Sequence, residues 1–203
     1  YLDEDNQAGR QGLIYAAERD LAIIIMEPLL GGKLAQQPPR EIQKLWDASG
    51  YKRTPAEWAL RWLWNHPQIT TVLSGMTTLD ELNENMRTAE TALANHLGAE
   101  ELRTVEAVRD KFKSLIKIEC TQCGYCTPCQ AKNIMIPSIF SFYNNALMFD
   151  SSDEPRATYK RVALMERDAS RCIECAQCEE ACPQGIPIVN MLKQAHEFLS
   201  REE

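Results

Sequence analysis

Residues 172–183 read Cys-Ile-Glu-Cys-Ala-Gln-Cys-Glu-Glu-Ala-Cys-Pro, and this stretch decides the organisation of the second half of the chain. Its four cysteines have the spacing C-x2-C-x2-C-x3-C-P. A short loop with this spacing can place three thiolates around one side of a cubane iron–sulfur cluster. The fourth thiolate must come from elsewhere, and in two-cluster proteins of this pattern the last cysteine of each run binds the other cluster. The stretch therefore indicates one half of a two-cluster site.

A second cysteine run occupies residues 120–129, where the spacing is C-x2-C-x2-C-x2-C. Its last gap is one residue shorter than that of the other run. If the last cysteine of each run binds the cluster of the other run, the two runs together bind two clusters. We predict that both are [4Fe–4S] clusters. One cluster is then held by Cys120, Cys123, Cys126 and Cys182, and the other by Cys129, Cys172, Cys175 and Cys178. Two such clusters predict a protein that passes electrons.

Structural zinc and disulfide bonds are the alternatives for these cysteines. Zinc ligands usually come as separated C-x2-C pairs, which does not account for a three-cysteine run occurring twice. A secreted disulfide-bonded domain would scatter its cysteines to tie distant loops together. Here every cysteine follows residue 119 and none is left over. The pattern favours iron–sulfur clusters, leaves zinc as the alternative, and predicts a reducing, cytoplasmic compartment.

The composition argues against two classes of partner. The 203 residues carry a formal net charge of −7, whereas nucleic acids and acidic membranes attract a basic surface. The longest apolar stretch, Leu21–Met26, is far too short to span a bilayer, and because the first residues lack a basic-then-apolar pattern we do not expect secretion. We therefore expect no nucleic-acid and no membrane partner. Because the sequence begins at Tyr1 without a methionine, we expect a fragment or a processed product.

The first half of the chain has an α/β pattern. Leu21–Met26 is apolar on both faces, as a parallel strand covered on both sides would be, and Ile69–Leu73 is a second β-branched run. Between them, helices are predicted near Arg40–Ala48 and Thr54–Asn65. The other helices are expected over residues 8–19, 78–94 and 99–115. Strand, helix, strand, helix is the order of a βαβ unit.

Two of these helices begin with a capping box. Thr54-Pro55-Ala56-Glu57 places a threonine at the N-cap, a proline at the first helical position and a glutamate at the third. Thr78-Leu79-Asp80-Glu81 repeats the arrangement. These motifs predict where the two helices start.

The second half of the chain contains no strand pattern after Ile118. Helices are predicted over residues 137–149, 156–165 and 187–201. We therefore expect an α-helical module with cluster-binding loops rather than a small β-hairpin ferredoxin. The histidines stand singly, without cysteine or carboxylate at metal-ligand spacing, and are predicted to be surface or capping residues: His66, His96 and His196.

Five segments, in order along the chain, carry a resemblance to a known family. They are Tyr1-Leu2-Asp3-Glu4, Ile25-Met26-Glu27-Pro28-Leu29-Leu30-Gly31-Gly32-Lys33-Leu34, Val72-Leu73-Ser74-Gly75-Met76-Thr77-Thr78, Glu81-Leu82-Asn83-Glu84-Asn85 and Cys120-Thr121-Gln122-Cys123-Gly124-Tyr125-Cys126. With them, nearly the whole chain resembles the C-terminal part of the iron–sulfur-containing branch of the aldo/keto reductase superfamily.

The resemblance implies an α/β fold that is the C-terminal part of a (β/α)8 barrel, followed by an α-helical ferredoxin-type domain. Leu21–Met26 would be the seventh strand and Ile69–Leu73 the eighth, with the end of the sixth at Tyr1. The active site of such barrels lies at the C-terminal ends of the strands, here Glu27–Lys33 and Ser74–Thr78. The expected domains are the barrel part at 1–98, a bridging helix and linker at 99–119, and a two-[4Fe–4S] ferredoxin-like domain at 120–203.

In this family the two loops hold a nicotinamide dinucleotide, and the resemblance implies how this chain would do so. The start of the helix after Thr78 would be available to an anion. Acidic Glu81 stands where the family has a basic residue for a 2′-phosphate, so NAD, another redox partner or no nucleotide is expected rather than NADP. The adenine-side contacts would be Gly75, Thr77, Glu81 and Asn85.

The resemblance also implies an oxidoreductase whose barrel site exchanges electrons with the two clusters. The family's catalytic Tyr, Lys, Asp and His come from earlier strands, so we assign no catalytic residue and expect this chain alone to lack them. The implied partners are the upstream half of the barrel and either a redox protein or a small-molecule substrate. An electron-carrier subunit of ferredoxin type, without its own substrate site, is the alternative, and a zinc-binding interaction module is the third.

Overall fold

A computed structural model of the chain describes residues 1–4, 8–129 and 132–201. The chain divides into two compact units, Tyr1–Lys113 and Ser114–Glu203. The division falls at the end of helix α5 (Ala99–Ser114), which belongs to the first unit for nearly its whole length. No described helix is long and apolar enough to cross a membrane.

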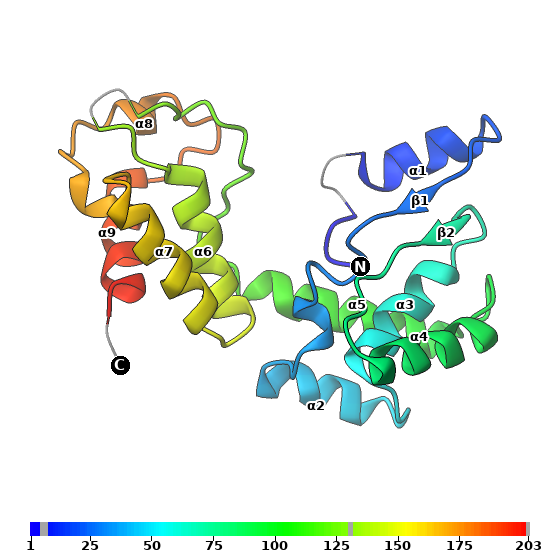
Figure 1. Cartoon of the computed structure of the whole chain (residues 1–203). Coiled ribbons are helices and arrows are strands. Elements are labelled where there is room, and N and C mark those ends of the chain that lie inside the picture. Colours follow the sequence, from blue (N-terminus) through cyan, green and yellow to red (C-terminus); the bar gives the residue numbers. More distant parts are fainter. Residues whose placement is uncertain (5–7, 130–131, 202–203) are drawn as a thin grey trace. The chain divides into compact units, whose positions relative to one another are not determined.

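The first unit contains a two-stranded parallel sheet (Figure 1). Strand β1 (Ile24–Ile25) pairs with β2 (Thr71–Val72) in the register Ile24 to Thr71 and Ile25 to Val72. The predicted parallel pairing is confirmed, but both strands are much shorter than the apolar runs that predicted them. Ile24 and Met26 are 57% and 74% exposed. The expectation of a strand covered on both sides is therefore wrong for the described residues.

The helices of the first unit follow one another along the chain in the order expected. The elements are α1 (Gly9–Ala17), η1 (Lys33–Ala35), α2 (Arg40–Ala48), α3 (Pro55–Trp64), α4 (Leu79–Thr91) and α5. Thr54 caps α3 by accepting the Glu57 N–H at 3.0 Å. The Glu57 carboxylate does not complete the predicted capping box, because it pairs with Arg53 and Arg61. Thr78 and Glu81 form the full box at the start of α4.

Aromatic side chains fill the core of the first unit. The rings of Trp46 and Trp58 stack with centroids 4.9 Å apart, and both side chains are buried. Tyr1 makes edge contacts with Trp46 and Trp62. The tryptophans of α2 and α3 thus serve packing. Because all four tryptophans of the chain lie in this unit, their fluorescence reports on it alone.

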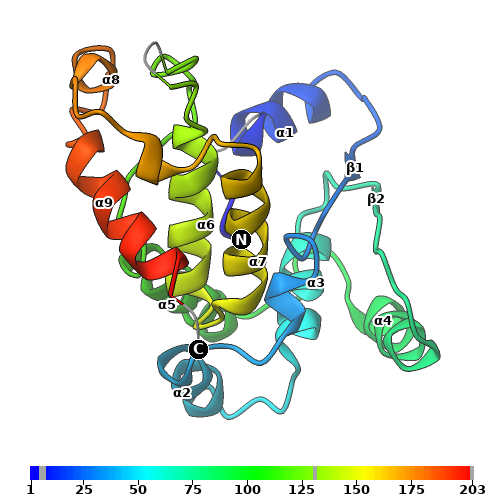
Figure 2. The same ribbon diagram turned by 60° about the vertical axis from the view of Figure 1, so that its left-hand side comes forward.

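The second unit is helical throughout its described residues. Its elements are α6 (Ile136–Met148), α7 (Asp153–Leu164), η2 (Ala169–Arg171), α8 (Gln177–Glu180) and α9 (Ile188–Leu199). Helices α6, α7 and α9 pack on one another (Figure 2). The sequence predicts these three, although α7 begins three residues earlier than expected. It does not predict η2 and α8, which are only three and four residues long.

One apolar core joins the three long helices to the cysteine runs. Twelve buried residues form it: Ile118, Ile134, Ile136, Ile139, Phe140, Tyr159, Ala169, Ile186, Ile188, Leu192, Ala195 and Leu199. Half-buried cysteines of both runs pack against it, among them Cys129 and Cys182. Burial of this apolar area is what holds the loops in place beside the helices.

Candidate iron–sulfur site

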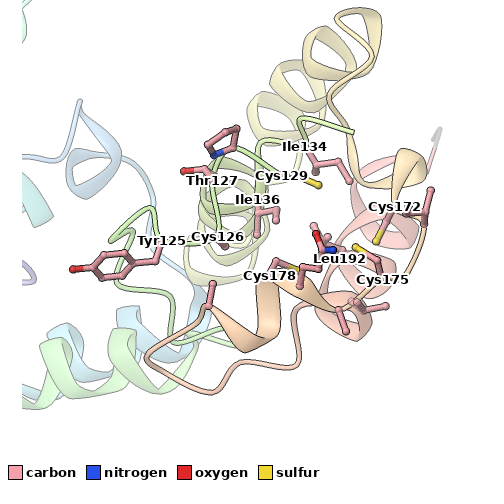
Figure 3. Close-up of a pocket in the computed structure, with 16 residues that line it drawn as sticks. Tyr125, Cys126, Thr127, Cys129, Ile134, Ile136, Cys172, Cys175, Cys178 and Leu192 are labelled. Atoms are coloured by element: carbon pink, nitrogen blue, oxygen red, sulfur yellow. The ribbon is translucent and has the colours of Figure 1, made fainter. Parts of the chain in front are cut away.

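The last cysteine of the first run shares a pocket with three cysteines of the second run. The pocket has a volume of about 240 Å³. Cys129, Cys172, Cys175 and Cys178 line it, and Figure 3 shows these four side chains around it. The rest of the lining is largely apolar, with Ile136 and Leu192 at its base on the core side. The structure thus brings together the four thiols that the exchanged-ligand pattern assigns to one cluster.

The other four cysteines line a second, narrower pocket of about 20 Å³. They are Cys120, Cys123, Cys126 and Cys182. Phe140, Ile186 and Ile188 supply much of the apolar wall. The two pockets lie next to each other, because Cys126 and Ile136 belong to both linings. Four thiols in a largely apolar wall are the donor set that a [4Fe–4S] cluster requires, and each pocket supplies at least four.

The two cysteine runs have the same backbone conformation around their middle cysteines. Gln122 and Gly124, on either side of Cys123, have φ of 57° and 81°. Glu174 and Ala176, on either side of Cys175, have φ of 57° and 59°. Left-handed residues make the chain turn tightly. Each loop therefore curls around its middle cysteine, and Cys123 and Cys175 are the two exposed cysteines.

Burial governs the acidity of the inner thiols. Burial, together with the neighbouring Cys172 and Cys129 thiolates, raises the pKa of the Cys178 thiol to about 11. Burial also raises the pKa of the Cys126 thiol, with Cys120, Cys123 and Cys182 as the neighbouring thiolates that add to it. Each of these neighbouring thiols lines the same pocket as the thiol whose pKa it raises. Since metals bind the thiolate form, loading either pocket must release protons.

No group of three or more His, Cys, Asp or Glu side chains among the described residues is placed to hold a single metal ion. In a cubane each thiolate binds a different iron atom, so the thiols of a cluster site surround a wider space than those of a mononuclear site.

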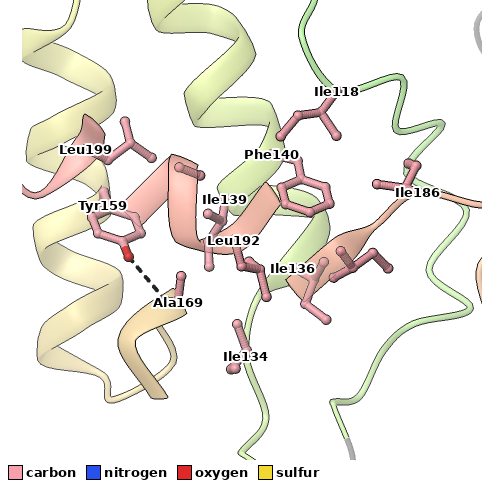
Figure 4. Close-up of a cluster of buried hydrophobic side chains, with 12 residues drawn as sticks. Ile118, Ile134, Ile136, Ile139, Phe140, Tyr159, Ala169, Ile186, Leu192 and Leu199 are labelled. Atoms are coloured by element: carbon pink, nitrogen blue, oxygen red, sulfur yellow. Dashed lines mark hydrogen bonds between the residues drawn. The ribbon is translucent and has the colours of Figure 1, made fainter. Parts of the chain in front are cut away.

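Two polar side chains that the sequence analysis did not single out lie at the entrances to the cysteine runs. Asn144, on α6, bonds to the backbone of Lys117 and Ile118, just before Cys120. The hydroxyl of Tyr159, on α7, accepts the N–H of Ala169, three residues before Cys172 (Figure 4). Neither contact leaves a local sequence signal, because the partners are at least ten residues apart.

The first unit has a pocket of its own, of about 700 Å³, at the ends of β1 and β2. Gly75, Glu81 and Asn85 line it, as do Met26 and other residues of the loop after β1. Thr77 is not part of the lining, and its N–H and hydroxyl donate to the Glu81 carboxylate at 2.7 and 3.1 Å. The structure therefore gathers three of the four residues expected at the adenine side.

The Glu81 carboxylate lies at the start of α4, where the resemblance implies that an anion could bind. Its Oε2 accepts the N–H groups of Thr77 and Thr78, and these bonds lower the pKa of the carboxyl. A carboxylate held at a helix N-terminus offsets the positive end of the helix dipole. A phosphate group at this point would meet a negative charge rather than free N–H groups.

Two family models match the chain. The model of the aldo/keto reductase family matches residues 6–110, which is more than half of the chain. The model of a 4Fe-4S dicluster domain matches residues 119–186, a segment that contains all eight cysteines. Comparison with curated proteins found no match, and neither did comparison with solved structures. The chain therefore belongs to the aldo/keto reductase family and carries a 4Fe-4S dicluster domain after its reductase segment.

Proposed function

We propose that this chain is part of an oxidoreductase in which a barrel active site exchanges electrons with two [4Fe–4S] clusters. The interleaved linings of the two cysteine pockets carry the proposal. Cys129 joins Cys172, Cys175 and Cys178, and Cys182 joins the three earlier cysteines. When bound, each cluster would supply one-electron transfer.

The residues of the second unit would bind, orient and shield the clusters. Six half-buried cysteines pack against the core, while each pocket also has one exposed cysteine, Cys123 or Cys175. Apolar walls keep water away from the inner thiols and lower the local polarity, which affects a cluster's potential. Because the pockets share Cys126 and Ile136, an electron could pass between them over a short distance.

The first unit would supply the C-terminal part of the (β/α)8 barrel of the reductase. The parallel pair β1 and β2 and the exposed apolar residues Ile24 and Met26 support this, since the rest of a barrel would cover such residues. The upstream half of the barrel is thus the proposed partner of this unit. The pocket beside Gly75, Glu81 and Asn85 is the proposed nucleotide site, with NAD preferred to NADP because Glu81 opposes a 2′-phosphate.

The clusters are tested by metal and sulfide analysis of the chain after anaerobic reconstitution. We expect about eight iron and eight acid-labile sulfide atoms per chain, since two [4Fe–4S] clusters contain that many. Bound zinc without sulfide would instead support the zinc-binding interaction module. Calorimetric titration with NADH and NADPH tests the nucleotide site. Binding of NADPH as tight as that of NADH would contradict the role given to Glu81.

The alternative, an electron-carrier subunit of ferredoxin type, shares the clusters but has no substrate site. The full-length gene that encodes the chain distinguishes the reductase from the electron carrier. Upstream strands that carry the family's Tyr, Lys, Asp and His would support the reductase. A gene without them would support the carrier.

A further inference from the structure

Asn144 fixes the chain as it enters the first cysteine run. Its Oδ1 accepts the N–H groups of Lys117 and Ile118, each at 3.1 Å, and its Nδ2 donates to the Ile118 carbonyl at 2.7 Å. The Cys120 N–H in turn donates to that same carbonyl at 2.8 Å. One side chain on α6 therefore fixes the backbone at Ile118, two residues before Cys120, the first cysteine of this run.

Tyr159 does the same for the second cysteine run. Its ring lies in the core and is 2% exposed. The hydroxyl oxygen accepts the Ala169 N–H at 3.2 Å and lies 2.7 Å from Nδ1 of His196 on α9. The Ala169 carbonyl accepts the Cys172 N–H at 3.1 Å. The hydroxyl and Nδ1 of His196 form a hydrogen bond whose direction follows the imidazole tautomer, and this bond orients the hydroxyl.

The last cysteine of each run is held by other residues. The Cys129 carbonyl accepts the Asn133 N–H at 2.9 Å, and Arg167 donates to the Asn133 carbonyl and side chain at 3.1 and 3.4 Å. The Cys182 N–H donates to the Glu179 carbonyl at 3.1 Å, and the Glu179 carboxylate accepts the Val189 N–H at 2.8 Å. Loss of an entrance contact should thus leave the exchanged fourth ligand of the other cluster in place.

We propose that Asn144 and Tyr159 are positioning residues for two different clusters. Asn144 sets the loop that supplies Cys120, Cys123 and Cys126, and Tyr159, oriented by His196, sets the loop that supplies Cys172, Cys175 and Cys178. This proposal rests on the proposed function, because it assumes that the two pockets hold clusters. It adds that each pocket has its own support on the helical core, so that one cluster can be lost while the other stays.

The test compares N144A and Y159F with the wild-type chain after anaerobic reconstitution. Iron and sulfide per chain should fall by half in each variant, from about eight to about four. Two reduced clusters in adjacent pockets couple magnetically. In a variant that keeps one cluster, the electron paramagnetic resonance spectrum should therefore lose the features that arise from this coupling. The spectrum left in N144A should match that of C123S, and the spectrum left in Y159F should match that of C175S.

Two variants on α6 control for the loss of an amide and for the loss of a hydroxyl. N145A removes the neighbouring asparagine of α6, whose Nδ2 donates to Ser141 Oγ at 3.5 Å within that helix, and Y143F removes a hydroxyl from a ring that packs on Phe198. Both should keep the full iron content. H196A should weaken the same cluster as Y159F, and H196N, whose amide restores a hydrogen-bonding group near the Nδ1 position, should recover it.

Three results would overturn the proposal. One is a wild-type iron content and spectrum in N144A and Y159F. Another is the same residual spectrum in both variants. The third is loss of both clusters together with the helical circular dichroism, which would make these residues general supports of the fold. A wild-type chain that takes up no cluster would contradict the proposed function as well.

Discussion

Gly124 and Ala176 occupy equivalent places, each one residue after the middle cysteine of its run, and both have a left-handed backbone with φ of 81° and 59°. Only glycine adopts this conformation without strain, and for another residue it costs about 1–2 kcal/mol. The first run therefore has the unstrained residue at this position and the second run has the strained one. Substitutions at the two positions should have opposite effects on stability.

We expect G124A to destabilise the second unit by about 1 kcal/mol. The added Cβ would lie 3.5 Å from Thr127 Oγ1, an ordinary contact, so the cost comes from the backbone alone. A176G should stabilise by about 0.5 kcal/mol, since the relief of strain exceeds the added freedom of the unfolded chain. Anaerobic urea unfolding, followed by the visible absorbance of the clusters, measures both. A181G is the control, because Ala181 has a helical backbone and glycine there should destabilise.

Ile139 tests the apolar core of the second unit. It is fully buried on α6 and lines neither cysteine pocket. We expect I139A to cost about 2–5 kcal/mol of unfolding free energy, through lost burial and the cavity left behind. L164A, on an 86% exposed side chain of α7, should change it by less than about 0.5 kcal/mol. Equal stability of the two variants, measured by the same unfolding experiment, would show that the described core does not support the loops.

Glu81 should make the stability of the first unit depend on pH in the acid range. The N–H groups of Thr77 and Thr78 lower the pKa of its carboxyl in the folded state. The stabilisation is therefore fully present above the unfolded pKa of about 4.3 and is lost as the pH falls through the lower folded value. E81Q keeps a capping side chain without the charge and should flatten this dependence.

Tryptophan fluorescence measures this effect, since it reports on the first unit alone. Unfolding midpoints of the wild type and E81Q should converge as the pH falls below about 4. D80N is the control, because Asp80 lies on the same turn outside the capping box. If D80N and E81Q change the acid dependence equally, net charge rather than the cap determines it.

The parts of the structure that follow from local pattern could be predicted from the sequence. Arg40–Ala48 is a helix over the predicted residues, and Thr54 and Thr78 are N-caps as their motifs indicate. The sequence indicates where the two strands lie, but not at which residues they begin and end. Apolar character alone does not tell Leu21, which is 56% exposed, from a residue that a neighbouring strand covers.

The sequence predicts the cysteine ligands of the candidate site, but not the residues that support them. Cysteine spacing indicates which thiols could share a cluster, because the loop geometry is local. The supports at Asn144 and Tyr159 depend on contacts made 26 and ten residues away along the chain. His196 was expected at the surface or at a cap, yet it is half-buried and bonds to Tyr159. Such partners are set by helix packing, which a single sequence does not show.

An isolated chain of residues 1–203 should not reduce carbonyl compounds. Its described residues contain two short strands, and the family's catalytic side chains are expected on earlier ones. We predict no turnover of simple aldehydes with NADH or NADPH above the rate without protein. Steady consumption of either nucleotide by the purified chain would show that a catalytic set is present in these residues after all.

The exchange of the fourth ligands is tested most directly by an anaerobic crystal structure of the reconstituted chain, with the iron atoms located from their anomalous scattering. The account predicts Cys129 Sγ bound to the cluster of Cys172, Cys175 and Cys178, and Cys182 Sγ bound to the cluster of Cys120, Cys123 and Cys126. Two clusters that are each closed by the four cysteines of a single run would contradict it.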